Sequence, residues 1–510
     1  MLAVVILLRA ALCDKGVKTH NMRRAGVLLH PTSLPGGGMC GELGNEAYDF
    51  VDFLVASDMR VWQMLPVGPT HDDLSPYQCY SAFAGNVSLI SLEKVLQEEW
   101  LQIGEYHLFL EAVPDKSTLD KLISIKFLYG QFCQNATDAQ KEEFSHFESA
   151  HKHWLDDFSL FSVLKNKFIS YSWVHWPKPL RDRKQSALQD ARLEYSAELK
   201  IMSFAQFLFF KQWDDLKQYA NQRGIELFGD LPLFVAHDSA DVWARRELFK
   251  LDGEGQPTFV AGVPPDYFSE TGQRWGNPVY DWVAMQVDGY QWWLERFDVL
   301  FKQFDLVRID HFRGLEAYWE IPASHETALN GSWVDGPKDD FFNALKQKYG
   351  AELPLVAEDL GVITEDVDRL RKENHLPGMK ILHFAFDSDS LNPYLPHNHE
   401  IESVVYTGTH DNNTTLGWYN SLDDQVKTRI SEYFAYPQEA MPWLLIRSAF
   451  SSVAELAIIP MQDLLSLGGE HRMNTPGTTE GNWHWRFSWE QVNREELTLR
   501  VQKLAQLYRR

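Results

Sequence analysis

Cysteine is scarce in this 510-residue sequence, with four residues at positions 13, 40, 79 and 133. Their wide spacing fits neither a zinc-binding pattern nor a disulfide framework, which favours a reducing compartment such as the cytoplasm, or the plastid stroma of a plant. No helix-like stretch carries an HExxH pair of histidines. The sequence therefore predicts no catalytic metal, and it leaves a structural calcium ion as an open alternative.

Positive charge is also in short supply. The chain has 48 Lys and Arg residues against 71 Asp and Glu residues, a net charge of −23 at pH 7. Nucleic acids and anionic membranes are bound through basic stripes, so neither is an expected partner. We expect a soluble enzyme with a neutral substrate, and no sequence feature assigns its oligomeric state.

Long apolar runs are absent apart from LAVVILLRAAL near the N-terminus. Arg9 interrupts this run, no basic segment precedes it, and it is too short to span a bilayer. Strand-like order begins only after Met22. We expect residues 1–21 to form an extension outside the fold and Met22 to be the natural start; a weak signal peptide is the alternative.

A nucleotide cofactor has little support. GGGMCG at 36–41 formally fits the GxGxxG fingerprint of dinucleotide-binding proteins. That fingerprint requires a strand running directly into the glycines and an acidic residue at the end of the next strand. Pro31 and Pro35 lie between the first apolar run and the glycines, so no strand runs directly into them. The next apolar run ends without an acid. We expect no cofactor.

What the sequence does contain is a series of short apolar runs, each ending in Gly, Pro or polar residues. After Met22 there are eight, at 26–30, 60–66, 225–232, 304–310, 353–359, 379–384, 403–409 and 456–463. Helix-like stretches such as 47–57 and 366–374 separate most of them. Strands that alternate with helices indicate parallel β/α units. Eight units predict an α/β fold, a closed (β/α)₈ TIM barrel with its reactive groups at the C-terminal ends of the strands.

Two long segments interrupt this alternation. Residues from about 86 to 200 read as helical and charged, whereas 234–298 is rich in Gly, Pro and aromatic residues. Ordered loops of the second composition are typical of lids and binding loops. With no repeat and no linker, we expect residues 22–510 to form a single catalytic barrel domain. The two insertions would be mainly helical subdomains on the C-terminal face of the strands.

Three carboxylates stand at the ends of predicted strands: Asp310 in VRIDHF, Glu358 in LVAEDLG and Asp411 in GTHDNN. Alternation with period two places Arg308 and Asp310 on the same, inward face of their strand. One ionised acid that attacks and a second acid that delivers a proton are the requirements of glycoside chemistry. The alternative interpretation is that each acid is a helix cap or an ion-pair partner.

Motifs along nearly the whole chain, from Gly26 to Phe487, resemble glycoside hydrolase family 77, the 4-α-glucanotransferases (amylomaltases or disproportionating enzymes). They occur in the order of that family. The matching motifs are HPTSLPG (30–36), SPYQCYSAFAGN (75–86), GDLPLFVAHDSADVWA (229–244), GVPPDYFSETGQRWGNPVYDW (262–282), RIDHFRG (308–314), AEDLG (357–361), GTHDNNTT (408–415) and RMNTPGTTEGNWHWR (472–486).

The resemblance implies that Asp310 is the nucleophile, Glu358 the general acid/base and Asp411 the group that grips the sugar at the cleaved bond. It implies substrate-binding roles for further residues. Those around the nucleophile are Arg308, His311 and His410; those facing the donor sugar are Tyr77 and Asp230; those in the acceptor-side lid are Gln273 and Trp275. We further expect the Arg308 guanidinium to keep Asp310 ionised, and Glu358 to hold a proton in less cationic surroundings.

The implied activity is retaining transfer of an α-1,4-glucan segment. The donor would be a malto-oligosaccharide, amylose, starch or a glycogen-derived glucan, and the acceptor the 4-hydroxyl of glucose or another glucan. A hydrolase of the α-amylase type would use the same three acids with water as the acceptor, and the motifs favour transfer. A non-catalytic glucan-binding protein is the third hypothesis, against which the presence of all three acids argues.

Overall fold

The computed structural model describes residues 23–36, 40–112, 121–168, 171–265 and 269–510. The expectation for residues 1–21 lies outside these ranges. Each of the eight apolar runs after Met22 forms a strand. The strands are β1 (Arg24–Leu28), β2 (Val61–Gln63), β3 (Glu226–Pro232), β6 (Leu306–Asp310), β9 (Leu355–Ala357), β10 (Gly378–Ile381), β11 (Ser403–Tyr406) and β12 (Leu456–Pro460).

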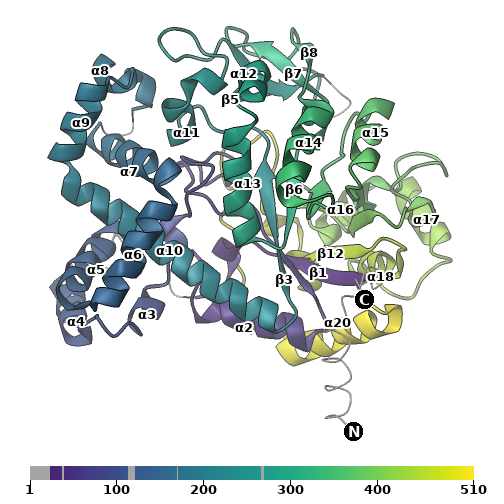
Figure 1. The fold of residues 1–510 in the computed structure, drawn as a ribbon. Coiled ribbons are helices and arrows are strands. Elements are labelled where there is room, and N and C mark those ends of the chain that lie inside the picture. Colours follow the sequence, from purple (N-terminus) through teal and green to yellow (C-terminus); the bar gives the residue numbers. More distant parts are fainter. Residues whose placement is uncertain (1–22, 37–39, 113–120, 169–170, 266–268) are drawn as a thin grey trace.

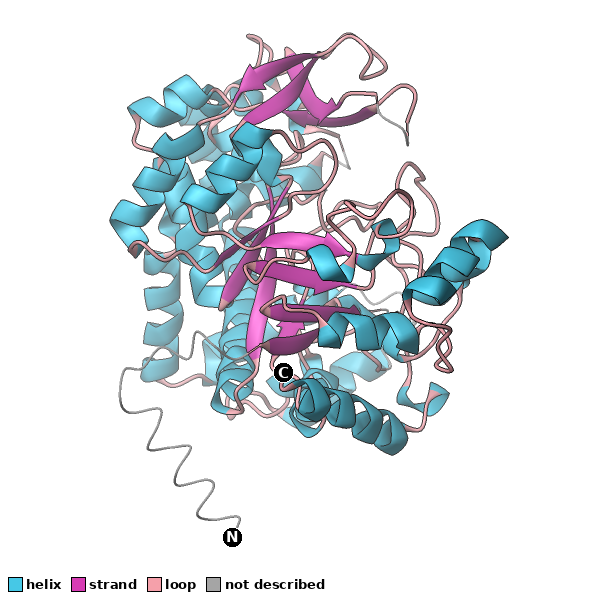
Figure 2. Cartoon of the chain, turned by 90° about the vertical axis from the view of Figure 1, so that its right-hand side faces the viewer, coloured by secondary structure: helices cyan, strands magenta, loops and turns pink. Residues whose placement is uncertain are grey.

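These eight strands form one parallel sheet in the order β10-β11-β12-β1-β2-β3-β6-β9. The two end strands also meet, because the backbone N–H of Ala357 donates to the carbonyl of Pro377 at 2.9 Å. The predicted TIM barrel is thereby confirmed. In Figure 2 its strands cross the centre of the molecule, surrounded by helices.

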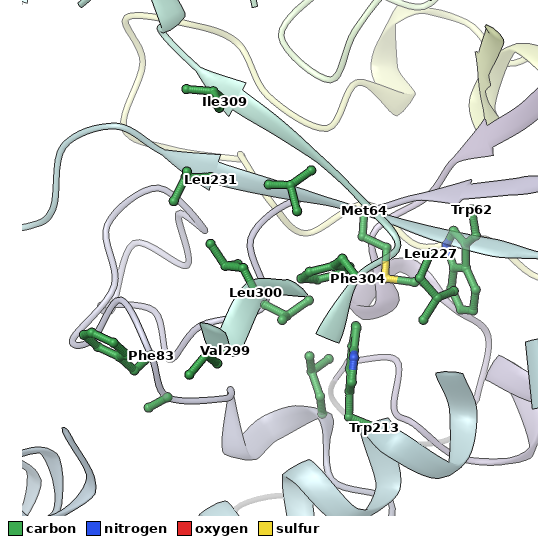
Figure 3. Close-up of a cluster of buried hydrophobic side chains, with 14 of the residues drawn as sticks. Trp62, Met64, Phe83, Trp213, Leu227, Leu231, Val299, Leu300, Phe304 and Ile309 are labelled. Atoms are coloured by element: carbon green, nitrogen blue, oxygen red, sulfur yellow. The ribbon is translucent and has the colours of Figure 1, made fainter. Parts of the chain in front are cut away.

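Alternation along the strands separates two apolar layers. Leu28, Val61, Phe228 and Val356 pack together inside the barrel, with Leu306 of β6 against them. Figure 3 shows part of the outer layer, where Leu227 and Leu231 of β3 and Ile309 of β6 lie among side chains of the covering helices, including Trp213 and Leu300. Arg308, on the inward face of β6, therefore points into the barrel as predicted.

Helices cover the outside of the barrel. They include α2 (Asn45–Ala56), α13 (Gln291–Gln303), α14 (Lys338–Tyr349), α15 (Glu365–Glu373), α18 (Trp443–Ser451) and α20 (Arg494–Tyr508). The helices α16 (Thr415–Ser421) and α17 (Asp424–Tyr433) follow β11, and α19 (Met461–Leu464) follows β12. The helices expected at 47–57 and 366–374 are α2 and α15. A search of the described helices for one that is long and apolar enough to cross a membrane found none.

The segment from 86 to 200 is helical, as expected. Its helices are α3 (Leu92–Val95), α4 (Ile103–Ala112), α5 (Lys121–Asn135), α6 (Asp138–Ala150), α7 (Lys152–Lys167), α8 (Lys178–Arg181), α9 (Gln185–Glu194) and the start of α10 (Ser196–Gln222). In Figure 1 they form a lobe beside the barrel. α10 leaves this lobe and packs on the barrel, where the buried indole of Trp213 donates to the carbonyl of Gln303 at 2.9 Å.

The second excursion has an architecture that the sequence analysis did not anticipate. Beside the short helices α11 (Ala240–Ala244) and α12 (Trp282–Val287), it carries β4 (Phe259–Val263) and β5 (Gln273–Pro278). These pair with β7 (Ala317–Pro322) and β8 (Ser332–Asp335) in an antiparallel sheet of order β5-β4-β7-β8. This sheet lies at the top of Figure 1, over one side of the barrel. β5, QRWGNP, was missed because it contains Gly and Pro, which are poor strand formers.

Candidate active site

Arg308 and Asp310 lie two residues apart on the inward face of β6. The Nη2 atom of Arg308 donates to Oδ1 of Asp310 at 2.9 Å. The same guanidinium holds Asp230, which faces it on the neighbouring strand β3, through bonds of 2.9 Å from Nε and 2.7 Å from Nη2. Arg308 and Asp230 are both buried. One buried cation is thus shared between two carboxylates, and only Asp310 reaches the barrel mouth, where a third of its side chain is exposed (33%).

Tyr77 joins this group from the loop after β2. Its hydroxyl donates to Oδ2 of Asp230 at 2.7 Å and accepts from Nη2 of Arg308 at 3.0 Å. The Tyr77 ring stacks on the imidazole of His410, with ring centroids 5.3 Å apart. The structure therefore brings together five of the predicted site residues, Tyr77, Asp230, Arg308, Asp310 and His410, from segments far apart in the sequence.

Glu358 is held mainly by backbone groups. The chain turns sharply after Asp310, with His311 in the left-handed region (φ 53°, ψ 47°). The His311 N–H donates to Oε2 of Glu358 at 2.7 Å, and the Leu360 N–H donates to Oε1 at 3.0 Å. The N–H of Glu358 itself donates to the carbonyl of Ile309 on β6 at 3.1 Å. Both carboxyl oxygens and the backbone of Glu358 are therefore fixed next to Asp310.

Asp411, the third predicted acid, follows β11 and is the most open of the three, with 49% of its side chain exposed. The amide of Asn474 donates to its Oδ1 at 2.6 Å, and His410 Nε2 lies 3.4 Å from the same oxygen. Arg472 donates to the backbone carbonyl of Asp411 at 2.9 Å. An open, oriented carboxylate of this kind can accept hydrogen bonds from a ligand.

Arg472, Asn474 and Trp483 are site residues that the sequence analysis did not single out. The ring of Trp483 lies 6.0 Å from the rings of both Tyr77 and His410. All three belong to RMNTPGTTEGNWHWR, a motif rich in aromatic and amide residues that follows the last barrel strand. That composition was the available signal, but nothing in the local sequence shows that the segment returns to Asp411.

The predicted lid residues lie on one side of the site. Gln273, exposed at the start of β5, accepts a 3.1 Å hydrogen bond from the indole N–H of Trp275. The Trp275 ring meets His311 edge to face, with centroids 4.8 Å apart. Trp275 thus contacts both Gln273 and His311, the residue that follows β6. Within the described ranges, the buried Nε2 of His311 has no hydrogen-bond partner.

Burial controls the protonation of this site. Desolvation raises the pKa of Glu358 to about 7, although Arg308 and the two backbone N–H groups lower it. Arg308 makes the expected contact with Asp310, but the pKa of Asp310 also lies well above its ordinary value. Burial and the neighbouring acids Asp230, Glu358 and Asp411 outweigh the guanidinium. The expectation was that the Arg308 guanidinium keeps Asp310 ionised; the guanidinium does lower the pKa of Asp310, but the net shift is upward.

The two site histidines are neutral at neutral pH. Burial lowers the pKa of His311 to about 3 and lowers the pKa of His410 as well. A neutral imidazole can donate one hydrogen bond and accept another, which suits hydroxyl groups. Over the residues that the structure describes, no three His, Cys, Asp or Glu side chains are grouped so that they could hold a metal ion.

A closed β/α barrel with three acids and a shared arginine at the C-terminal ends of its strands defines a class of enzymes that act on glycosidic bonds. Comparison with known proteins specifies the family. The 4-alpha-glucanotransferase model of glycoside hydrolase family 77 matches residues 29–492, and the chain belongs to this family.

Relatives that cover more than nine tenths of the chain support the assignment. A 4-alpha-glucanotransferase of Synechocystis is 47% identical over 499 residues, covering 96% of this chain and 98% of its own. One of Thermus thermophilus is 48% identical over 475 residues, covering 91% and 95%. An amylomaltase from Streptococcus agalactiae, solved in complex with acarbose, superposes with a TM-score of 0.90 at 37% identity, covering 96% and 99%. The sequence-based prediction of a transferase rather than a hydrolase is confirmed.

Proposed function

We propose that this enzyme transfers α-1,4-glucan segments by a retaining double displacement centred on Asp310 and Glu358. Asp310 attacks the anomeric carbon of the donor while Glu358 protonates the departing glycosidic oxygen, which gives a β-linked glucosyl-enzyme. Glu358 then takes the proton from the 4-hydroxyl of the acceptor as that oxygen displaces Asp310. The observation that carries the proposal is that the two acids have different partners. The Arg308 side chain contacts Asp310, whereas backbone N–H groups contact Glu358.

Arg308 donates directly to Asp310, and no described guanidinium or ammonium group lies within ion-pair distance of Glu358. In a coupled pair of carboxyls that shares one proton, the direct ion pair favours the negative charge on Asp310. Glu358 then carries the proton. Because the pKa of both acids is raised, the ion pair between Arg308 and Asp310, and not the pKa shifts, is what distinguishes them. Neighbouring acids in such unequal surroundings divide into a nucleophile and a proton donor.

The remaining groups would hold the sugar. Asp411, oriented by Asn474 and half open to solvent, would accept bonds from hydroxyls of the sugar at the cleaved bond. Tyr77 and Asp230 would face the donor sugar, and neutral His311 and His410 would bond hydroxyl groups. Gln273 and Trp275, on the lid side of the site, would contact the acceptor.

The expected substrates are malto-oligosaccharides, amylose and starch- or glycogen-derived glucans. A neutral polymer suits a protein with a net charge of −23, and the sparse cysteines suit a reducing compartment, the cytoplasm or a plastid stroma. Products formed from maltotriose test the activity. Transfer yields glucose and longer chains while the number of reducing ends stays constant; a rise in that number would show that water is the main acceptor and contradict the proposal.

A further inference from the structure

The barrel is closed at the seam between β9 and β10. Seven parallel ladders join the other neighbouring strands, whereas no ladder joins this pair in the described structure. Two hydrogen bonds cross the seam. The Ala357 N–H donates to the Pro377 carbonyl at 2.9 Å, and the carboxylate Oδ1 of Asp359 accepts from the Met379 N–H at 2.7 Å. The residue between Ala357 and Asp359 is Glu358.

Asp359 is itself anchored on the outside of the barrel. Only 9% of its side chain is exposed, and its Oδ2 lies 3.3 Å from Nε of Arg371, which projects from α15 and is 4% exposed. Arg371 also donates to the Leu376 carbonyl at 3.0 Å and to Asp368 at 2.7 Å. Asp359 and Arg371 therefore connect α15, the segment that leads into β10, and the residue next to Glu358.

The first residue of β10 leaves room for this carboxylate. A Cβ atom added at Gly378 would lie 2.3 Å from Oδ2 and 2.9 Å from Cγ of Asp359, which is too close. Because Gly378 has no side chain, the Asp359 carboxylate can lie directly over the start of the strand and reach the N–H of Met379. The carboxylate of Asp359 thus has one hydrogen bond, from the Met379 N–H, and one ion-pair contact, with Arg371; we call these two contacts the clamp. Hydrogen bonds to charged groups exceed neutral ones in strength.

We propose that Asp359 is a positioning residue for Glu358, an inference that rests on the role of Glu358 proposed above. Glu358 points into the barrel and Asp359 points out, so the clamp on Asp359 holds the shared peptide unit from the outer side. The bond from the Glu358 N–H to the Ile309 carbonyl holds the preceding peptide unit, between Ala357 and Glu358, from the β6 side. Without the clamp, the seam can shift and move the Glu358 carboxyl away from the leaving oxygen. A displacement of about 1 Å can cost on the order of 100-fold in rate.

Two glucosyl donors distinguish a positioning role of Asp359 from general damage to the fold. Maltotriose needs a proton from Glu358 to release its leaving group, whereas α-glucosyl fluoride forms the glucosyl-enzyme without one. For Asp359→Ala we expect the single-turnover rate of glucosyl-enzyme formation from maltotriose to fall by about 10–100-fold. The burst of fluoride release should change by less than about threefold, because Asp310 and Arg308 are untouched. KM for maltotriose should stay close to that of the unmodified enzyme, and the high-pH limb of kcat/KM should shift.

Asp359→Asn keeps an oxygen for the Met379 N–H but loses the charge and replaces the oxygen that faces Arg371 with an NH2 group, so we expect an intermediate effect. Asp366→Asn is the matched control. Asp366 lies on α15, the helix that carries Arg371, but its ion pair with Arg369, at 2.8 Å, is exposed. It should change neither rate. If Asp359→Ala does not fold, Asp359→Asn and Arg371→Met carry the same test.

Equal losses with both donors, or unchanged maltotriose rates in a folded variant, would overturn the positioning role. Failure of the positioning role is distinguishable from failure of the proposed function. If the proposed function fails, neither the unmodified enzyme nor any position-359 variant would form an adduct on Asp310.

Discussion

The backbone N–H of His311 donates a 2.7 Å hydrogen bond to the carboxyl group of Glu358. His311 directly follows Asp310, so the residue after the proposed nucleophile holds the proposed acid/base. The left-handed backbone of His311 bends the chain at the end of β6 (φ 53°), a conformation that costs free energy in a residue other than glycine. The two acids are thereby placed by one short segment of chain.

Replacing Asp310 with Asn should abolish turnover, because an amide cannot act as the nucleophile. Loss of a residue that acts in a catalytic unit reaches roughly a million-fold. Maltotriose disproportionation and a thermal melt measure activity and folding side by side. Normal activity in a folded Asp310→Asn protein would refute the assignment.

Replacing Glu358 with Gln should trap the glucosyl-enzyme formed from α-glucosyl fluoride. This donor needs no acid, but without a base the acceptor cannot complete the second step. Intact-mass and peptide-mapping spectrometry should find one glucosyl group on Asp310. Mapping to Asp411 would contradict the roles proposed here.

The retaining mechanism also predicts that the carboxyl groups of Asp310 and Glu358 lie about 5–5.5 Å apart in a crystal structure, rather than roughly 6.5–9.5 Å.

The pH profile of kcat/KM should show a high-pH limb governed by Glu358. Its pKa is about 7 in the folded protein, and the acid must be protonated to release the leaving group, so activity falls as the pH rises through that value. The same limb should be absent for fluoride release from α-glucosyl fluoride. If activity falls at the same pH with both donors, the titrating group is not Glu358.

Glu358 should also affect stability in a pH-dependent way. Its pKa is raised from 4.5 in an ordinary glutamate to about 7, so the folded state binds the proton more tightly than the unfolded state. Its contribution is fully present below about pH 4.5 and is lost as the pH rises through about 7. We therefore expect Glu358→Gln to raise Tm relative to the unmodified enzyme more at pH 8 than at pH 5. Denaturation monitored by circular dichroism measures this; an equal difference at both pH values would refute it.

Asn474 should support substrate binding through Asp411. Its amide donates to Oδ1 of Asp411 at 2.6 Å, and hydrogen bonds to charged groups contribute about 1.5–3 kcal/mol, so Asn474→Ala should lower kcat/KM by about tenfold or more. Asn474→Asp should be worse, because it places a second negative charge beside Asp411. Initial rates over a range of maltotriose concentrations measure both, and an Asp variant as active as the Ala variant would contradict the charge argument.

Much of this site could be predicted from local pattern. Period-two alternation along FDLVRID placed Arg308 and Asp310 inward, and eight apolar runs separated by helices predicted the barrel that places strand ends together. The strands of the antiparallel sheet were not predictable in the same way, because an edge strand such as QRWGNP, which contains Gly and Pro, shows no alternation of apolar and polar residues. Asn474 was missed for a related reason: its partner Asp411 is distant in sequence, and no local signal indicates the contact.

The sequence by itself determined which side chains face the barrel interior and which acids stand at strand ends, because alternation and strand length are local properties of the backbone. Only the tertiary structure decided that Arg308 is shared among Asp310, Asp230 and Tyr77, and that Asp359 reaches across the seam to Met379. It also decided that the pKa of Asp310 is raised despite its guanidinium partner. The pKa of a buried group depends on its burial and on the charges and hydrogen-bonding groups around it. Here those surroundings come from segments that meet only when the barrel closes.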